Sequence, residues 1–194
     1  MMVEGARKTR QRLHRAAKAG DTDAMNNLGA LALHADRDPV QARQWFQRAA
    51  KAGDTLAMYN LAQLLEGSDP AQAQRWYKRA AKAGLIDAML NLGVLLEGSD
   101  PAQAQRWYKR AAEAGDSDAM VNLGMMLSDS DPAQARRWYK RAAEAGQTEA
   151  MVNLGALLVG SDPVKARQWF QRAAEAGDST AIHNLRVLDD SNPG

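Results

Sequence analysis

The sequence contains no cysteine, and this absence removes several kinds of site at once. Without thiols the chain has no disulfide framework, no thiolate-bound zinc ion and no cysteine nucleophile. It also lacks any apolar run near the roughly 20 residues that a membrane-spanning helix needs. Residues 1–12 are polar and basic with no apolar core segment, unlike a secretory signal. We therefore expect a cytoplasmic protein that has no membrane partner.

Histidine is also scarce, and the three histidines, His14, His34 and His183, lie far apart in the chain. The sequence contains no glycine-rich phosphate loop and no serine, histidine and aspartate set spaced for nucleophilic catalysis. We therefore expect no catalytic residue, no metal ion, no cofactor and no small-molecule substrate. An enzyme is the least favoured class of function.

Residues 131–146 carry the start and stop signals of one complete helix. Asp131 is a favourable N-cap, and Pro132 suits the first helical position because its missing N–H has no partner there. Gly146 supplies the left-handed residue that ends a helix. Between these signals the apolar residues recur at steps of three and four and form one face: Ala135, Trp138, Tyr139, Ala142 and Ala143.

This unit repeats along the chain. Its closing glycine recurs with a spacing of 33 residues once and then 31 residues four times, at Gly20, Gly53, Gly84, Gly115, Gly146 and Gly177. A fixed period of this size is typical of stacked helical repeats. Another helix precedes each capped helix, and the loop of about four residues between them predicts antiparallel hairpins.

The expected fold class is therefore all-α, an α/α solenoid of about 12 helices that forms a single array over residues 1–194. In each pair we name the earlier helix the first helix and the later one the second helix, and we count the unpaired last helix, over 180–188, among the first helices. The predicted elements are an N-terminal capping helix over 4–19, pairs over 21–53, 54–84, 85–115, 116–146 and 147–177, and a C-terminal capping helix over 180–188.

Each second helix carries a tryptophan followed directly by another aromatic residue. The pairs are Trp45–Phe46, Trp76–Tyr77, Trp107–Tyr108, Trp138–Tyr139 and Trp169–Phe170. We expect both rings of each pair to lie in the core, rather than to stack on nucleic-acid bases, because they share the alanine-rich face. The small residues that pack against these rings are the paired alanines and the mid-helix glycines of the first helices: Gly29, Gly93, Gly124 and Gly155. A glycine in the middle of a helix costs about 1 kcal/mol relative to alanine, so its recurrence there indicates close packing.

The repeated pattern Ala-Met-x-Asn-Leu-Gly, followed by Asp-Pro-x-x-Ala-x-x-Trp-Tyr/Phe-x-Arg-Ala-Ala-x-Ala-Gly, closely resembles Sel1-like repeats, which are relatives of tetratricopeptide repeats. The resemblance covers residues 5–188, with a shortened Glu-Gly-Ser-Asp-Pro loop in place of a longer Gly-x-Gly-Val loop. It implies a right-handed superhelix whose first helices line the concave face. It also implies a scaffold or adaptor that binds another protein or a peptide.

Each first helix contains an asparagine directly before the leucine of the repeated pattern: Asn27, Asn60, Asn91, Asn122, Asn153 and Asn184. The resemblance implies that such an amide, which offers a donor and an acceptor, pairs with the main chain of a bound peptide. The alternative is that it bonds a neighbouring helix or a loop carbonyl. The predicted peptide-binding residues are Asn60, Asn91, Asn122 and Asn153 with Tyr59, Leu90, Val94, Val121, Met125 and Val152.

Lysine and arginine are concentrated in the second helices. The first helices contain no lysine or arginine except Arg186, whereas the five second helices carry 17. We therefore expect the groove to exclude an acidic peptide C-terminus and to favour an apolar or mildly basic segment. The alternative function is RNA or DNA binding by cations of the second helices, which could follow phosphates: Lys78, Arg79, Lys109, Arg110, Lys140 and Arg141. A solvated basic face is the simpler interpretation, so nucleic acid is the less favoured partner.

Overall fold

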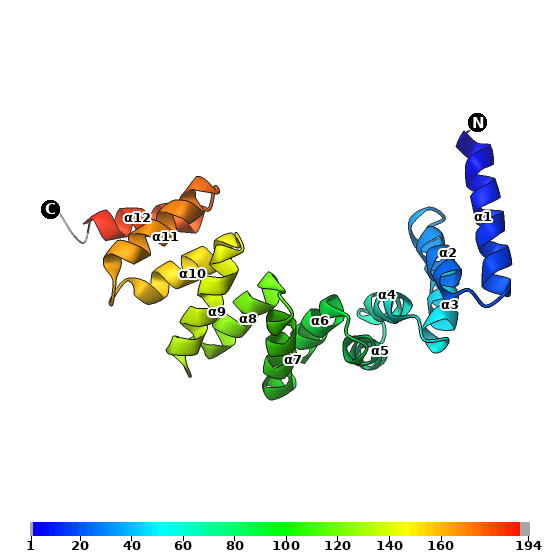
Figure 1. Cartoon of the computed structure of the whole chain (residues 1–194), viewed down its shortest axis with the longest axis horizontal. Coiled ribbons are helices and arrows are strands. Elements are labelled where there is room, and N and C mark those ends of the chain that lie inside the picture. Colours follow the sequence, from blue (N-terminus) through cyan, green and yellow to red (C-terminus); the bar gives the residue numbers. More distant parts are fainter. Residues whose placement is uncertain (1, 191–194) are drawn as a thin grey trace. The chain divides into compact units, whose positions relative to one another are not determined.

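A computed structural model describes residues 2–190, and all regular structure in this range is helical (Figure 1). The helices are α1 (Met2–Lys18), α2 (Thr22–His34), α3 (Pro39–Lys51), α4 (Thr55–Leu65), α5 (Pro70–Lys82), α6 (Ile86–Leu96), α7 (Pro101–Glu113), α8 (Ser117–Leu127), α9 (Pro132–Glu144), α10 (Thr148–Leu158), α11 (Pro163–Glu175) and α12 (Ser179–Asp190). The predicted all-α fold, with twelve helices in the described range, is confirmed.

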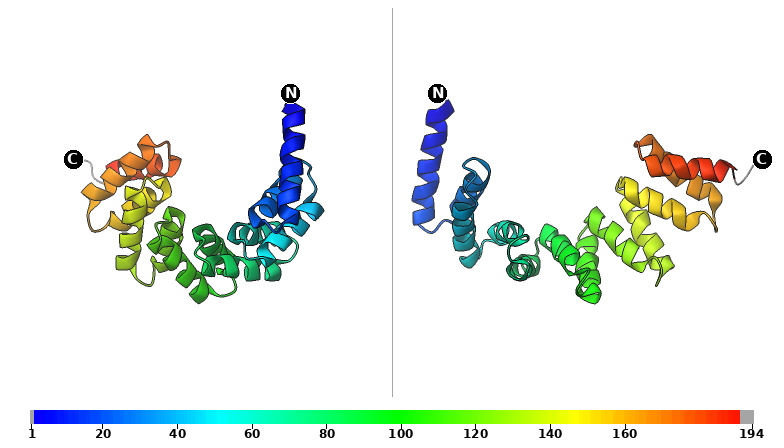
Figure 2. Two further views of the ribbon diagram at one scale, coloured as in Figure 1. Left: turned by 45° about the vertical axis from the view of Figure 1, so that its right-hand side comes forward. Right: turned by 180° about the vertical axis from the view of Figure 1, so that it is seen from behind.

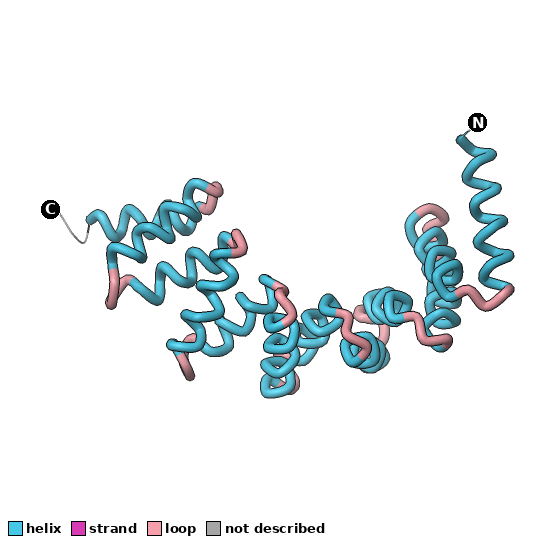
Figure 3. Tube along the Cα trace, viewed as in Figure 1, coloured by secondary structure: helices cyan, strands magenta, loops and turns pink. Residues whose placement is uncertain are grey.

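The chain divides into two compact units, residues 1–95 and residues 96–194. In each unit the main packing joins helices that follow one another in the chain, such as α2 with α3 and α3 with α4, or α8 with α9 and α9 with α10. Short loops connect the helices (Figure 3), and within each unit they run as antiparallel pairs (Figure 2). The single array over residues 1–194 stays a prediction.

The N-termini of the second helices are capped as the sequence predicts. The capping aspartates accept a backbone N–H from the residue three positions later at 2.9–3.1 Å: Asp38, Asp69, Asp100, Asp131 and Asp162. Proline follows each of them at the start of the helix. At the other end of α9, Gly146 has a φ of 95°, which side chains with a Cβ rarely adopt. These signals fix where each second helix begins and ends.

The two rings of each aromatic pair have different surroundings. The second ring is fully buried in every repeat, at 0–2% exposure: Phe46, Tyr77, Tyr108, Tyr139 and Phe170. Among the indoles only Trp107 is buried, at 8% exposure, and the other four are half-buried. An arginine three residues later lies over each indole at 4.5–4.8 Å from the ring centroid.

The prediction that both rings belong to the core is therefore wrong for the four half-buried indoles. Adjacent residues of a helix point about 100° apart, so both rings cannot face the neighbouring helix equally. The second ring occupies the space that the first helix leaves at its glycine. A Cβ atom added at Gly124 would lie 2.5 Å from Tyr139 Cε1, and one at Gly29 would lie 2.5 Å from Phe46 Cδ1. The predicted glycine–ring contact is confirmed at these positions.

Candidate functional site

The predicted binding residues of unit 1–95 lie on α4 and α6, and three of them, Tyr59, Asn60 and Asn91, make hydrogen bonds between helices. The Asn60 amide nitrogen donates to Asn26 Oδ1 of α2 at 2.9 Å. The Asn91 amide nitrogen donates to the hydroxyl oxygens of Tyr59 and Tyr77, both at 3.3 Å. Asn60 and Asn91 therefore link consecutive first helices, as the alternative interpretation of the sequence proposed.

Tyr59 is half-buried and lies at the centre of this network. Its hydroxyl oxygen accepts hydrogen bonds from Gln63 at 3.0 Å and from Asn91. Its ring packs against the ring of Tyr77, with centroids 5.7 Å apart. Burial, and secondly the charge of Asp87, raise the pKa of Tyr59. The ring is thus held in place on the surface of the first helices.

Two clefts open between first helices of unit 1–95, each beside one of these asparagines. The cleft between α2 and α4 has a volume of about 260 Å³ and is lined by Ala30, Leu33, His34, Phe46, Asn60, Gln63 and Leu64. The cleft between α4 and α6 has a volume of about 220 Å³ and is lined by Gln63, Glu66, Asn91, Val94 and Leu95. Both are smaller than the roughly 300–1,000 Å³ pockets that hold small-molecule ligands, so they suit single side chains better.

The first of these clefts has a neighbour on the side of α1. A third cleft, of about 440 Å³, is lined by Thr9, Leu13, Asn27, Ala30, Leu31, His34 and Ala35 from α1, α2 and the loop that follows. Ala30 and His34 line both spaces. The N-terminal helix therefore contributes to the surface beside Asn27, rather than only covering the end of the stack.

The remaining predicted residues differ in how much surface they offer. Val94 of α6 is 53% exposed and Met125 of α8 is 48% exposed, whereas Val121 is 4% exposed and packs in the core of unit 96–194. The other four, Leu90, Asn122, Val152 and Asn153, are half-buried on α6, α8 and α10. Val94 and Met125 are thus the predicted apolar residues that are most accessible to a partner.

The acceptors of the buried tyrosines were not part of the sequence prediction. Tyr77 donates its hydroxyl hydrogen to Glu66, and Tyr108 donates to Glu97 Oε1 at 2.6 Å. Burial is the main cause that raises the pKa of both tyrosines, and the neighbouring carboxylate adds to it. A sequence signal existed, because each acid lies eleven positions before its tyrosine.

Among residues 2–190, no group of three or more histidine, aspartate or glutamate side chains is placed to hold a metal ion. His14 packs edge-on against Trp45, with ring centroids 5.6 Å apart. No helix in the same range combines the length and apolar character needed to cross a membrane.

Comparison with protein families finds five consecutive matches. A family model described as Sel1 repeat matches residues 22–54, 55–85, 86–116, 117–147 and 148–178. Each match contains one first helix, its second helix and the loop between them. Comparison with curated proteins gave no match.

Solved structures show the same fold. A protective antigen of uropathogenic Escherichia coli strains that displays an SLR fold is 29% identical, with a TM-score of 0.81 over 91% of this chain and 43% of its own. A Sel1 repeat protein from Oxalobacter formigenes is 28% identical, with a TM-score of 0.74 over 91% of this chain and 58% of its own. The chain therefore spans about half the length of these two proteins. Yeast Tom70, 14% identical over 94% of this chain and 43% of its own, shares the fold alone, with a TM-score of 0.65.

Proposed function

The chain belongs to the Sel1 repeat family, and we propose that it is a non-catalytic scaffold or adaptor whose first helices bind a segment of another protein. Helical repeat arrays commonly use the surface of one set of helices to bind protein partners. The residues proposed to form this surface or to support it are those named from the sequence: Asn60, Asn91, Asn122, Asn153, Tyr59, Leu90, Val94, Val121, Met125 and Val152. Val121 would contribute through the core that supports the surface, because it is buried.

The observation that carries this proposal is the pair of clefts beside Asn60 and Asn91. Both clefts are lined by apolar side chains together with the Gln63 amide, and Glu66 lines one of them. Neither lining contains lysine or arginine. This chemistry favours a partner segment whose side chains are apolar or mildly basic.

The asparagine amides can still bind a partner while they link the helices. Asn91 uses its amide nitrogen for the hydroxyl groups of Tyr59 and Tyr77. Its carbonyl oxygen retains acceptor capacity, since an amide has two donors and an acceptor with two lone pairs. A main-chain N–H of an extended peptide would be a suitable donor to this oxygen. The hydrogen bonds to the tyrosines would then orient the amide before the partner arrives.

Nucleic-acid binding by the second helices is less favoured, because many of those cations already have partners. Arg79, Arg110 and Arg141 lie over indole rings. Lys109 lies 3.9 Å from Glu113, and Lys140 lies 3.7 Å from Glu144. The exposed pairs are weak, but they reduce the net charge that a phosphate backbone would meet.

The proposal is tested by placing a charge in one cleft and the same charge outside it. Val94→Lys adds a cation to the cleft between α4 and α6. Val40→Lys makes the same change on α3, where Val40 is 67% exposed and lines neither cleft. The immobilised native protein and both variants are incubated with lysate of the source cells, and retained proteins are quantified by mass spectrometry.

We expect a set of proteins that the native chain and Val40→Lys retain and that Val94→Lys loses. Thermal unfolding followed by circular dichroism verifies that both variants fold, as expected for changes at exposed positions. If folded Val94→Lys retains the same proteins in the same amounts, the first-helix surface does not bind them and the proposal fails.

A further inference from the structure

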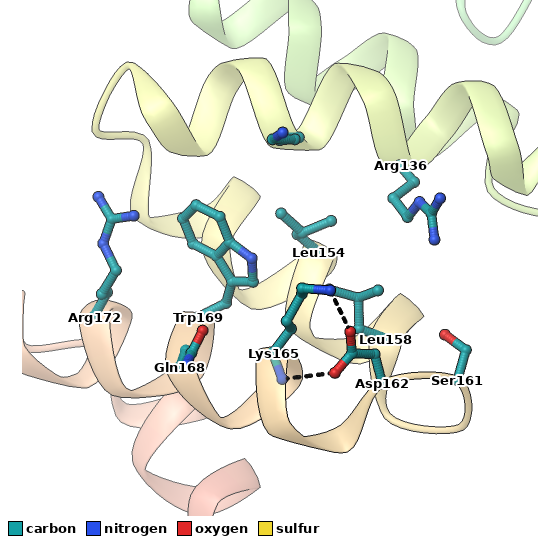
Figure 4. Close-up of a pocket in the computed structure, with 10 residues that line it drawn as sticks. Arg136, Leu154, Leu158, Ser161, Asp162, Lys165, Gln168, Trp169 and Arg172 are labelled. Atoms are coloured by element: carbon teal, nitrogen blue, oxygen red, sulfur yellow. Dashed lines mark hydrogen bonds and ion pairs between the residues drawn. The ribbon is translucent and has the colours of Figure 1, made fainter.

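One cleft of unit 96–194 lies on the side of the second helices, between α9 and α11 (Figure 4). Its volume is about 560 Å³, within the range of roughly 300–1,000 Å³ of pockets that hold a ligand. Its apolar lining consists of Leu154 and Leu158 from α10 and the indole of Trp169 from α11. Figure 4 shows Trp169 beside Leu154, between Arg136 on one side and Arg172 on the other.

The rest of the lining is rich in cations. Arg136 and Lys140 come from α9, Lys165 and Arg172 come from α11, and Asp162 is the one carboxylate among the lining residues. The Lys165 ammonium group lies 2.6 Å from Asp162, and this contact is the main cause that lowers the pKa of that carboxyl group. Four cations therefore surround the apolar lining. Asp162 offsets part of their charge, and Lys140 also lies 3.7 Å from Glu144, which is not among the lining residues.

The polar groups of this cleft are mainly hydrogen-bond donors. Arginine and lysine side chains donate and do not accept, and the indole N–H of tryptophan only donates. In Figure 4 the indole nitrogen of Trp169 is on the side of Leu154, toward the middle of the cleft. Arg172 lies over the same indole at 4.6 Å from its centroid, which holds the ring and the guanidinium together. A complementary ligand must supply acceptors around an apolar group.

Two of the cations distinguish this pair of helices from the other repeats. The position of Arg136 is held by Gln74 and Gln105 in two other second helices, and by arginine in the remaining two. The position of Lys165 is held by glutamine in all four others: Gln41, Gln72, Gln103 and Gln134. In the sequence, only α9 followed by α11 combines an arginine at the first position with a lysine at the second.

We propose that this cleft binds an acidic peptide segment of a partner protein, with one aliphatic or aromatic side chain flanked by carboxylates. The apolar side chain would rest on Leu154, Leu158 and Trp169, while the carboxylates pair with Arg136 and Lys165. Guanidinium groups suit this role because they bind carboxylates with two parallel hydrogen bonds. A nucleic-acid backbone would meet the cations but leave the leucine floor unused. The lining residues of this cleft differ from those of the first-helix clefts, which include no lysine or arginine and suit the opposite kind of segment.

The test uses a fluorescein-labelled peptide, Asp-Glu-Glu-Leu-Glu-Glu-Asp, and measures its fluorescence anisotropy with the intact chain at about 50 mM salt, where exposed charges are weakly screened. Arg136→Gln/Lys165→Gln gives the cleft the residues that other repeats carry. The matched control, Lys78→Gln/Arg137→Gln, also removes two cations, and other second helices carry glutamine at both of these positions. Thermal unfolding verifies that the two double variants fold alike.

We expect the cleft variant to weaken peptide binding by about tenfold or more, which corresponds to the loss of two charge-assisted contacts, and the control by less than about twofold. A peptide with glycine in place of leucine should also bind more weakly. Equal losses in the two double variants would show unspecific attraction and overturn the proposal.

Three further results would also overturn it. The glycine peptide could bind the native chain as tightly as the leucine peptide does, or the leucine peptide could fail to bind the native chain. An oligothymidylate of similar charge could also compete at this cleft and bind more tightly than the leucine peptide. The last result would identify the ligand as nucleic acid rather than as a protein segment.

Discussion

The hydroxyl group of Tyr108 donates a hydrogen bond of 2.6 Å to the carboxylate of Glu97, eleven positions earlier in the chain. In the same unit, the Tyr139 hydroxyl lies 3.1 Å from the hydroxyl group of Ser128, at the same spacing. Where the ring is Phe170, the residue eleven positions earlier is Val159. The hydroxyl group of the ring and the polar character of its loop partner therefore occur together.

This relationship predicts that Tyr108 and Glu97 are coupled energetically. Tyr108→Phe should lower the free energy of unfolding by about 1 kcal/mol, because one hydrogen bond is lost. Glu97→Val should cost about 1–3 kcal/mol, since the buried hydroxyl group loses its carboxylate acceptor. The double variant, which copies Phe170 and Val159, should recover much of the combined loss. Urea unfolding of the four proteins measures the coupling.

Additive losses would contradict this prediction. A coupling of about 1 kcal/mol is expected, as for other residues in direct contact. Tyr139→Phe is a useful comparison, because the hydroxyl group of Ser128 also donates to the Gly124 carbonyl oxygen at 2.9 Å and keeps that partner. The loss for Tyr139→Phe should therefore be smaller than the loss for Tyr108→Phe.

The two adjacent rings of α9 should contribute differently to stability. Tyr139 is 2% exposed, so Tyr139→Ala should cost about 3–5 kcal/mol, as for other buried aromatic residues. Trp138 is half-buried under Arg141, so Trp138→Ala should cost about 1–2 kcal/mol from partial burial and the lost cation–π contact. Chemical denaturation followed by circular dichroism compares the two variants.

Arg141→Gln provides the control for this comparison, because it removes the cation above Trp138 and leaves the ring. It should cost about 0.5–1 kcal/mol, the usual contribution of a cation–π pair near the surface. If Trp138→Ala destabilises the chain as much as Tyr139→Ala does, the assignment of the two rings to different environments is wrong.

The aspartate caps predict that stability falls in acid. The backbone N–H of Gln134, and secondly its side chain, lower the pKa of Asp131. A carboxyl group with a lowered pKa in the folded state stabilises that state above its unfolded pKa, near 3.9, and this contribution is lost as the pH falls through the folded value. Asp131→Asn keeps a good N-cap without the titration. Its melting temperature should therefore fall less between about pH 7 and pH 3 than that of the native chain.

Asp129→Asn is the charge-matched control, since Asp129 lies in the same loop but is not the cap of α9. It should follow the acid dependence of the native chain more closely than Asp131→Asn does. A decrease in melting temperature for Asp131→Asn as large as that of the native chain would show that the cap carboxylate does not contribute to the acid sensitivity. Circular dichroism at both pH values gives the melting temperatures.

The fold was predictable because its signals are local. Asp131, Pro132 and Gly146 determine where α9 begins and ends, and the structure has the same limits. The glycine of the first helix indicated a close ring, and Gly124 indeed faces Tyr139. The prediction that both rings are buried was wrong for four of the indoles, because both rings are hydrophobic and composition does not rank them. The arginine three residues after every tryptophan was a visible signal that the indole has a cation as its neighbour.

The candidate site was less predictable, because it depends on side chains of several helices. The sequence placed Asn91 on a first helix, but not its hydrogen bonds to Tyr59 and Tyr77, which come from two other helices. The cleft between α9 and α11 was not predicted at all. Its apolar lining comes from α10 and α11 and its cations come from α9 and α11, so no single stretch of sequence contains it.

The bond between Tyr108 and Glu97 also limits how this chain can be rearranged by recombination. A crossover in the loop between Glu97 and Tyr108 would combine the acid of one repeat with the ring of another. Some hybrids would then place a phenyl ring beside a carboxylate, or a phenol beside valine. Crossovers at the glycine turns, such as Gly115, keep both members of the pair together. Chains in which duplicated or exchanged segments begin and end at those turns should therefore fold more stably than chains in which the segments are cut within a hairpin.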